Sequence, residues 1–287
     1  MRAYNKCLTA VLALCCLVSC QEEIRPQDER CVKINAAISP TLITRVSDDG
    51  ALFLNGDVIR VENQDRLTEN IADYTYASSA NTWSTSDNLF WEGKQNNEFQ
   101  AWYPAESSYS EFDIPLDQSQ GYSSADWMTA HAIAKQSDGI VNFAFAHHLS
   151  KVTVNVVGWG SEYAEDNRTL NSVHIATVSE TVAKSDEEII GASAPGMVNA
   201  YSYNNTFSAV VAPGKYEADS EIVHLYINGS SEPLVVKAKA DINLLSGKAY
   251  KYNVTIGRDV IILDDSDVTV TDWIDEELLD QELTDIS

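Results

Sequence analysis

Three groups of residues in this chain have types and spacings that could support chemistry. The adjacent pair His147-His148 could supply imidazoles for metal binding or proton transfer. The acidic run 264–267 could supply carboxylate ligands for Ca²⁺. Cys20 could carry a lipid on its thiol, because it ends an apolar N-terminal run. The sequence contains no G-x-S-x-G, H-E-x-x-H, P-loop or dinucleotide-binding motif.

The first two groups lack the arrangement that a metal requires. Adjacent residues of a strand point to opposite faces, so His147 and His148 cannot chelate one ion from a regular strand. The run 264–267 lacks the glycine and the terminal glutamate of an EF-hand loop, which favours a solvated turn. The 43 acidic residues could include the two catalytic carboxylates of a glycosidase, because a sequence does not give the distances between carboxylates in space. We predict no metal, no cofactor, no catalytic residue and no enzymatic activity.

The N-terminal run has the parts of an export signal. Arg2 and Lys6 are positive, and the apolar stretch 8–18 is too short to span a membrane. The stretch Leu17-Val18-Ser19-Cys20 resembles the bacterial lipoprotein signal, in which the cysteine becomes the lipidated first residue. An ordinary secretory peptide with incidental cysteines is the alternative.

This signal predicts a membrane anchor. Residues 1–19 are the expected signal peptide, Cys20 the lipidation site, and 20–31 a linker. The residues after Cys20, Gln21-Glu22-Glu23, resemble the acidic export signal of some outer-surface lipoproteins. We therefore expect a lipid-anchored protein at the cell surface, on the outer membrane.

Charge and cysteine usage narrow the partners further. The formal net charge of −24 repels phosphate backbones and anionic lipid headgroups, so a nucleic acid partner is excluded. Cys7, Cys15 and Cys16 lie within the expected signal, which leaves Cys31 alone after Cys20 is lipidated. The sequence therefore predicts no disulfide framework, and the stability must come from a buried core.

Hydrophobic residues recur with a period of two along the chain. The clearest strands are 152–156, 250–256 and 267–271, where apolar and polar residues alternate. Shorter candidates are 32–38, 57–61, 99–103, 140–145, 170–178, 222–227 and 234–238, with turn signals such as Asn55-Gly56 between several of them. This pattern predicts an all-β protein of two β-sandwiches in series.

The expected boundary lies near His148, where two strand patterns meet. We place an N-terminal domain at 32–148 and a C-terminal domain at 149–273. The acidic tail 274–287 fits a short amphipathic helix or a frayed end better than a strand.

Short segments with a characteristic order link the chain to a known family. The segments are Thr44-Arg45, 55–61, Trp91-Glu92-Gly93, 99–104, Asp126-Trp127-Met128, 143–152, 245–250 and Asp272-Trp273. Their order and spacing resemble the fimbrillin family, which comprises subunits, tips and anchors of type V pili and related surface lipoproteins. The resemblance covers nearly all of residues 32–273.

The resemblance implies a fold and a mode of assembly. It implies two tandem transthyretin-like β-sandwich domains, a structural role for His147 at their junction, and donor-strand exchange with other pilus subunits. Cleavage after Arg45 by an Arg-specific protease would release the first strand, Val32 to Ile38. The alternative is that Arg45 is a solvated loop residue and that the first strand stays in place.

The residues leave the position in the pilus and the ligand open. A donor strand needs alternating apolar side chains, which the tail beyond Trp273 lacks, so a tip, accessory or anchor subunit fits at least as well as a stalk subunit. The alternative function is a non-polymerising, glycan-binding surface lipoprotein that uses exposed aromatic residues. The candidates are Trp83, Trp91, Trp102, Tyr103 and Trp127, although aromatic residues in strands more often belong to the core.

Overall fold

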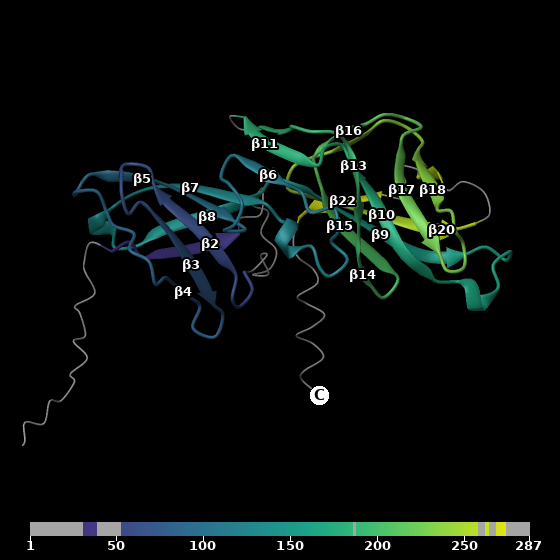
Figure 1. Cartoon of the computed structure of the whole chain (residues 1–287), viewed down its shortest axis with the longest axis horizontal. Helices are drawn as coiled ribbons and strands as arrows, with labels where there is room; N and C mark the ends of the chain where they lie inside the picture. Colours follow the sequence, from purple (N-terminus) through teal and green to yellow (C-terminus); the bar gives the residue numbers. More distant parts are fainter. Residues whose placement is uncertain (1–30, 39–52, 186–187, 258–261, 264–267, 274–287) are drawn as a thin grey trace, which may run out of the picture.

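The computed structural model describes residues 31–38, 53–185, 188–257, 262–263 and 268–273. These residues form strands, turns and three short 3₁₀ segments, and they contain no α-helix. The all-β fold class predicted from the period-two pattern is confirmed. In Figure 1 the strands gather in two groups along the long axis, with β2 to β5, β7 and β8 in one group and most of β9 to β22 in the other.

A seven-stranded sheet forms the first group, in the order β1-β8-β7-β5-β2-β3-β4. Its strands are β1 (Ile34–Ile38), β2 (Val58–Asn63), β3 (Ile71–Ala77), β4 (Thr82–Ser84), β5 (Asn96–Tyr103), β7 (Met128–Lys135) and β8 (Val141–His147). β1 and β4 are the two end strands of this order, yet they contact each other. The sheet therefore curls until its two edges meet beside a common core.

Two five-stranded sheets form most of the second group, in the orders β13-β10-β17-β18-β21 and β14-β15-β9-β20-β22. The first contains β10 (Leu170–Thr177), β13 (Gly196–Asn199), β17 (Glu221–Ile227), β18 (Leu234–Ala238) and β21 (Ile262–Leu263). The second contains β9 (Ser150–Trp159), β14 (Tyr201–Tyr203), β15 (Thr206–Val211), β20 (Lys248–Ile256) and β22 (Val268–Asp272). Two small sheets flank them, β12-β11-β6 and β16-β19. Their strands are β6 (Glu111–Asp113), β11 (Thr181–Ser185), β12 (Glu188–Gly191), β16 (Gly214–Tyr216) and β19 (Ile242–Leu244).

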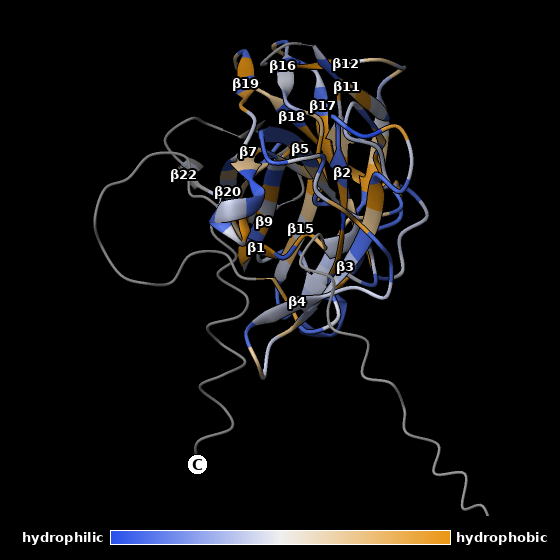
Figure 2. Cartoon of the chain, turned by 90° about the vertical axis from the view of Figure 1, so that its left-hand side faces the viewer, coloured by the Kyte–Doolittle hydropathy of each residue, from blue (hydrophilic) through white to orange (hydrophobic). Residues whose placement is uncertain are grey.

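Alternation along the strands creates the cores. In β8 every second residue from Val141 to His147 is buried, and in β20 Tyr250, Tyr252, Val254 and Ile256 are buried while the residues between them are exposed. Side chains from both five-stranded sheets enter one core cluster, which is the arrangement of a β-sandwich. Figure 2 shows the hydrophobic residues concentrated on the strands, while many of the connecting loops are hydrophilic.

The buried residues fall into two clusters that do not follow the chain in simple order. One cluster runs from Val32 to Phe145 and the other from Phe112 to Trp273. Phe112 and Trp127 precede residue 148 in the sequence but pack in the second cluster, and β6 pairs with β11. The predicted division into domains at 32–148 and 149–273 stays a prediction. Any such division must accommodate Phe112 and Trp127, which precede residue 148 but pack in the second cluster.

Candidate strand-exchange site and the strand-group junction

β1 lies at the edge of the seven-stranded sheet. It runs parallel to β8, with Ile34 opposite Val141 and Ile38 opposite Phe145. Val32 and Ile34 are buried in the first core, Ala36 and Ile38 pack against it, and the residues between them are exposed. One face of this short strand therefore inserts alternate apolar side chains into the core, as the sequence pattern predicted.

Hydrogen bonds anchor the two residues that precede β1, Val32 and Lys33. The Val32 N–H donates to the Leu89 carbonyl at 2.8 Å, and the buried Tyr74 hydroxyl donates to the Val32 carbonyl at 2.8 Å. The Val141 N–H donates to the Lys33 carbonyl at 2.9 Å. Burial raises the pKa of Tyr74 well above its ordinary value, so its hydroxyl stays protonated and remains a donor. Burying Val32 and Ile34 contributes about 1.5–3 kcal/mol for each side chain.

An open groove of about 690 Å³ lies beside β1. Residues of β1, of β4 and of the loop after β4 line it, and Lys33 and Asp87 are its only charged lining residues among those the structure describes. Most other lining groups are amides and hydroxyls, including Asn35, Asn88 and Asn142. The groove is therefore a nearly uncharged, hydrogen-bonding surface on a chain whose net charge is −24.

The aromatic residues named as a possible sugar platform lie mostly inside the protein. Trp91, Trp102, Tyr103 and Trp127 are all buried, with Trp127 fully inaccessible. Trp83 is half-buried and lines the groove, where its ring contacts Phe53 edge to face at 4.9 Å. The core assignment is therefore correct for four of these five residues.

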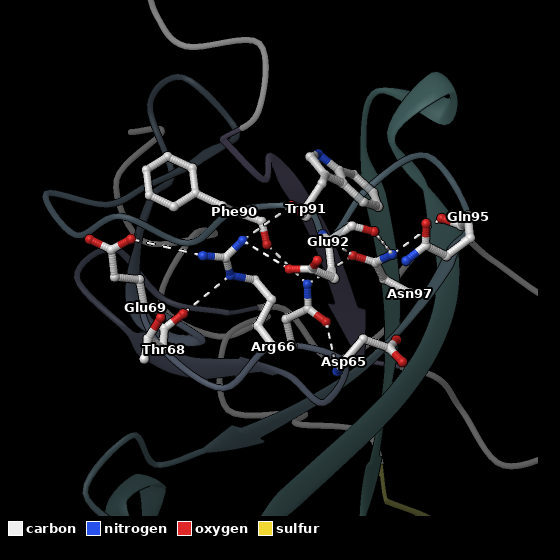
Figure 3. Close-up of polar contacts among 10 residues, drawn as sticks. Asp65, Arg66, Thr68, Glu69, Phe90, Trp91, Glu92, Gln95 and Asn97 are labelled. Atoms are coloured by element: carbon white, nitrogen blue, oxygen red, sulfur yellow. Dashed lines mark hydrogen bonds and ion pairs between the residues drawn. The ribbon is translucent and has the colours of Figure 1, made fainter.

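A polar network links the β2–β3 turn to the segment that leads into β5 (Figure 3). Arg66, in the β2–β3 turn, contacts Glu92 at 3.3 Å and donates to the carbonyls of Thr68 and Trp91. The fully buried Asn97 accepts hydrogen bonds from the Glu92 N–H and from the Asn63 amide. These groups satisfy one another and fix the loop that leads into β5, so we assign the network a structural role.

His147 is held at the junction of the two strand groups. Its Nδ1 donates to Asp126 Oδ1 at 2.7 Å, and both side chains are buried. The ring stacks on Trp273, with centroids 4.2 Å apart and planes 13° apart. Asp126 precedes β7, and Trp273 follows β22, so this histidine links segments that are distant in sequence. The structural role predicted for His147 is in accord with this geometry.

His148 points into a second polar chain. Lys184 Nζ donates to Thr129 Oγ1 at 3.3 Å, and Thr129 Oγ1 lies 2.6 Å from His148 Nε2. Burial, the positive charge of Lys184 and the neighbouring His147 lower the pKa of His148 from 6.5 to about 3. The ring is therefore neutral at ordinary pH, and its Nε2 accepts a hydrogen bond from the Thr129 hydroxyl.

Hydrogen bonds connect residues 148–150 to residues 245–247, the segment before β20. The Ser246 hydroxyl donates to the His148 carbonyl at 2.9 Å, and the Gly247 N–H donates to the Leu149 carbonyl at 2.9 Å. The Ser150 hydroxyl donates to the Leu245 carbonyl at 2.9 Å. Several of the segments that carried the family resemblance thus converge on one junction.

The sequence of the chain matches a known protein family over most of its length. The sequence model described as fimbrillin-like matches residues 44–273, which is most of the chain. The chain belongs to the fimbrillin-like family. The prediction of the family is therefore confirmed, and membership supports a role as a pilus or adhesion component.

Solved structures support the fold of this fimbrillin-like chain. A protein of proposed cell-adhesion role from Bacteroides uniformis ATCC 8492 shares 16% identity at a TM-score of 0.64, over 87% of this chain and 100% of that chain. A protein of similarly proposed role from Bacteroides ovatus ATCC 8483 shares 16% identity at a TM-score of 0.60, over 86% of this chain and 99% of that one. No curated protein matches the sequence. At this identity the likeness shows the fold alone.

Several predicted sites of the fimbrillin-like chain fall outside the described residues. These are Cys20, Arg45, the acidic run 264–267 and the tail 274–287. Within the described ranges, no group of three or more His, Cys, Asp and Glu side chains is arranged to hold a metal ion. None of the helical segments in those ranges is long and apolar enough to cross a membrane.

The sequence did not reveal the partners of the two histidines. Asp126 belongs to a segment that carried the resemblance, but it lies 21 positions from His147, a separation that no local pattern indicates. No sequence pattern indicated that Thr129 or Lys184 would contact His148. These contacts depend on the way β7, β8 and β11 meet, which only the folded chain shows.

Proposed function

We propose that this fimbrillin-like protein is a structural or adhesive component of a type V pilus, without enzymatic activity, and that it assembles by strand exchange at β1. The observation that carries the proposal is the position of β1 as a short edge strand with alternate buried side chains. A strand at an edge can be replaced by any segment that offers the same backbone ladder and apolar alternation.

The exchange begins with cleavage after Arg45, between β1 and β2. Once the covalent connection is cut, the described contacts that retain β1 include the β8 ladder, the hydrogen bonds at Val32, the contact with β4 and the burial of its apolar side chains. A donor strand from another subunit can form the same contacts, so the exchange costs little at equilibrium. The rate depends on the first strand leaving, and the contacts at Val32 slow that step.

The expected effect of Arg45→Ala is a block of assembly. Limited digestion with an Arg-specific protease should convert the wild type into a folded fragment that begins at Val46 and forms SDS-resistant oligomers with partner subunits. The Arg45→Ala protein should stay monomeric, because β1 remains covalently attached. Gel electrophoresis without boiling, together with N-terminal sequencing, measures both outcomes.

A matched control uses Arg60, which lies in β2 and pairs with Asp73 at 2.6 Å. Arg60→Ala should leave the processing at Arg45 and the oligomers intact. A cut fragment that stays monomeric with partner subunits present would refute strand exchange at β1.

The proposal places the protein on the outer membrane at the cell surface, anchored through lipid on Cys20. Cys20→Ala should move the protein from the membrane fraction to the soluble fraction, because a protein that lacks acyl chains loses its membrane affinity. Cell fractionation with immunoblotting measures this, and protease added to whole cells should cut the wild type. Unchanged membrane retention of the variant would contradict the anchor assignment.

A second candidate function is glycan binding without polymerisation. The nearly uncharged groove beside β1, with Trp83 and several amides in its lining, favours it. The purified protein distinguishes the two functions. A glycan binder is retained on immobilised polysaccharide and stays monomeric after protease treatment, whereas a pilus subunit forms SDS-resistant ladders.

A further inference from the structure

Two histidines face each other across adjacent strands of the second group. His174 in β10 lies opposite His224 in the antiparallel strand β17. Directly opposed residues of such a pair place their Cβ atoms about 4.5–5.5 Å apart on the same face. The sequence neighbours Val173, Ile175 and Leu225 are buried in the core, so the two half-buried imidazoles lie on the outer face of the sheet.

A carboxylate orients one of the two rings. His224 Nε2 lies 3.0 Å from Glu221 Oε2. A carboxylate accepts hydrogen bonds, so Nε2 carries the proton and Nδ1 of the neutral ring keeps its lone pair. A histidine that binds a metal through one nitrogen commonly donates the other N–H to a carboxylate in this way.

The imidazole ring of His174 is also suited to bind a metal. Burial and the adjacent His224 lower the pKa of His174, while Asp117 opposes the shift, so His174 is neutral at neutral pH and its ring can act as a ligand. The ring centroid lies 4.7 Å from that of Tyr226. The described part of the chain provides no hydrogen-bond partner for the His174 side chain, which leaves both ring nitrogens available.

We propose that His174 and His224 form a bidentate site for a divalent transition metal such as Zn²⁺, with Glu221 as a positioning residue. Imidazole nitrogen is a preferred ligand of zinc and similar ions, whereas Mg²⁺ and Ca²⁺ prefer oxygen ligands. The described residues offer no third clustered ligand, so water completes the coordination shell. The site therefore binds metal more weakly than a closed four-ligand structural site does.

The pair His174 and His224 can chelate one ion because both side chains lie on the same face of the sheet, whereas those of His147 and His148 do not. Neighbours along one strand point to opposite faces, whereas opposed residues on two strands share a face. His174 and His224 are 50 positions apart, so the sequence carries no local signal for the site.

The test is Zn²⁺ titration of the purified protein by calorimetry at neutral pH. We expect one bound equivalent of Zn²⁺ per chain, and His174→Gln and His224→Gln should each weaken its binding at least about tenfold. Glu221→Gln keeps both imidazoles and should weaken it by about tenfold or more, as the loss of a carboxylate partner does at other zinc sites. Excess Mg²⁺ should not displace the Zn²⁺.

His131→Gln is the matched control. His131 Nε2 lies 2.9 Å from Glu98 Oε1, which reproduces the histidine–carboxylate contact, but its opposite residue in β5 is Gln100. This variant should bind Zn²⁺ like the wild type. Because a variant could fail to fold, imidazole NMR signals of the wild type give a second readout, in which Zn²⁺ must shift His174 and His224. No bound equivalent, affinity unchanged by both His→Gln substitutions, or shifts confined to His131 would overturn the proposal.

Discussion

Val254→Asp should unfold the second strand group, with a loss of several kcal/mol in the free energy of unfolding. Val254 is 1% exposed at the centre of β20, which pairs with β9 on one side and β22 on the other. Placing a carboxyl group there removes apolar burial and leaves polar atoms without partners, at a cost on the order of 3–5 kcal/mol. Because domains are stable by only about 5–15 kcal/mol, denaturant titration should show a large drop in the unfolding midpoint.

The neighbours of Val254 provide the control. Asn253 and Thr255 are exposed on the other face of β20, and Asn253 Oδ1 accepts a hydrogen bond from Asn155 at 2.9 Å. Asn253→Asp keeps that acceptor, and Thr255→Asp stays in water, so each should change stability by less than about 1 kcal/mol. Equal losses on both faces would mean that β20 is buried on both sides, contrary to the sandwich.

The sequence predicted strands well where one face of a strand is buried and the other is exposed to solvent. β8 and β20 alternate between apolar and polar residues, and both were identified with nearly correct bounds. β15 was missed because its residues from Phe207 to Val211 are all buried, so its two faces do not differ in polarity. β7 was missed because Ala130 and Ala134 supply its buried face and give little hydrophobic contrast.

The candidate sites depended on contacts that no local pattern encodes. The sequence identified the first strand through its apolar alternation, and it identified His147 through the order of the family motifs. It did not pair His147 with Asp126, and it did not reveal that Phe112 and Trp127 cross into the second core. The opposed pair His174 and His224 was equally hidden, because strand register decides which side chains share a face.

Acidification should destabilise the junction through His148. The folded pKa of about 3 lies below the ordinary value of 6.5, so the unfolded chain binds more protons between these two values. The stability contributed by the neutral ring is therefore fully present above the ordinary pKa and is lost as the pH falls toward the folded pKa. Between about pH 7 and about pH 5 this one group should remove about 1–2 kcal/mol from the free energy of unfolding.

The groups that face His148 explain why it resists protonation. Lys184 donates to Thr129, the Thr129 hydroxyl lies 2.6 Å from His148 Nε2, and the Trp127 ring is 4.8 Å away. A proton on Nε2 would replace the acceptor of the Thr129 hydroxyl with a donor and would place a second positive charge near Lys184. His147 adds to this repulsion when it is charged.

His148→Gln separates this effect from the titration of the many carboxylates. The glutamine amide oxygen can accept the Thr129 hydroxyl but does not titrate, so the variant should lose less stability than the wild type between about pH 7 and about pH 5. Urea unfolding at a series of pH values gives both curves, and their difference isolates His148. Parallel curves would show that His148 titrates alike in the folded and unfolded chain, in which case the Lys184–Thr129–His148 contacts do not hold it neutral.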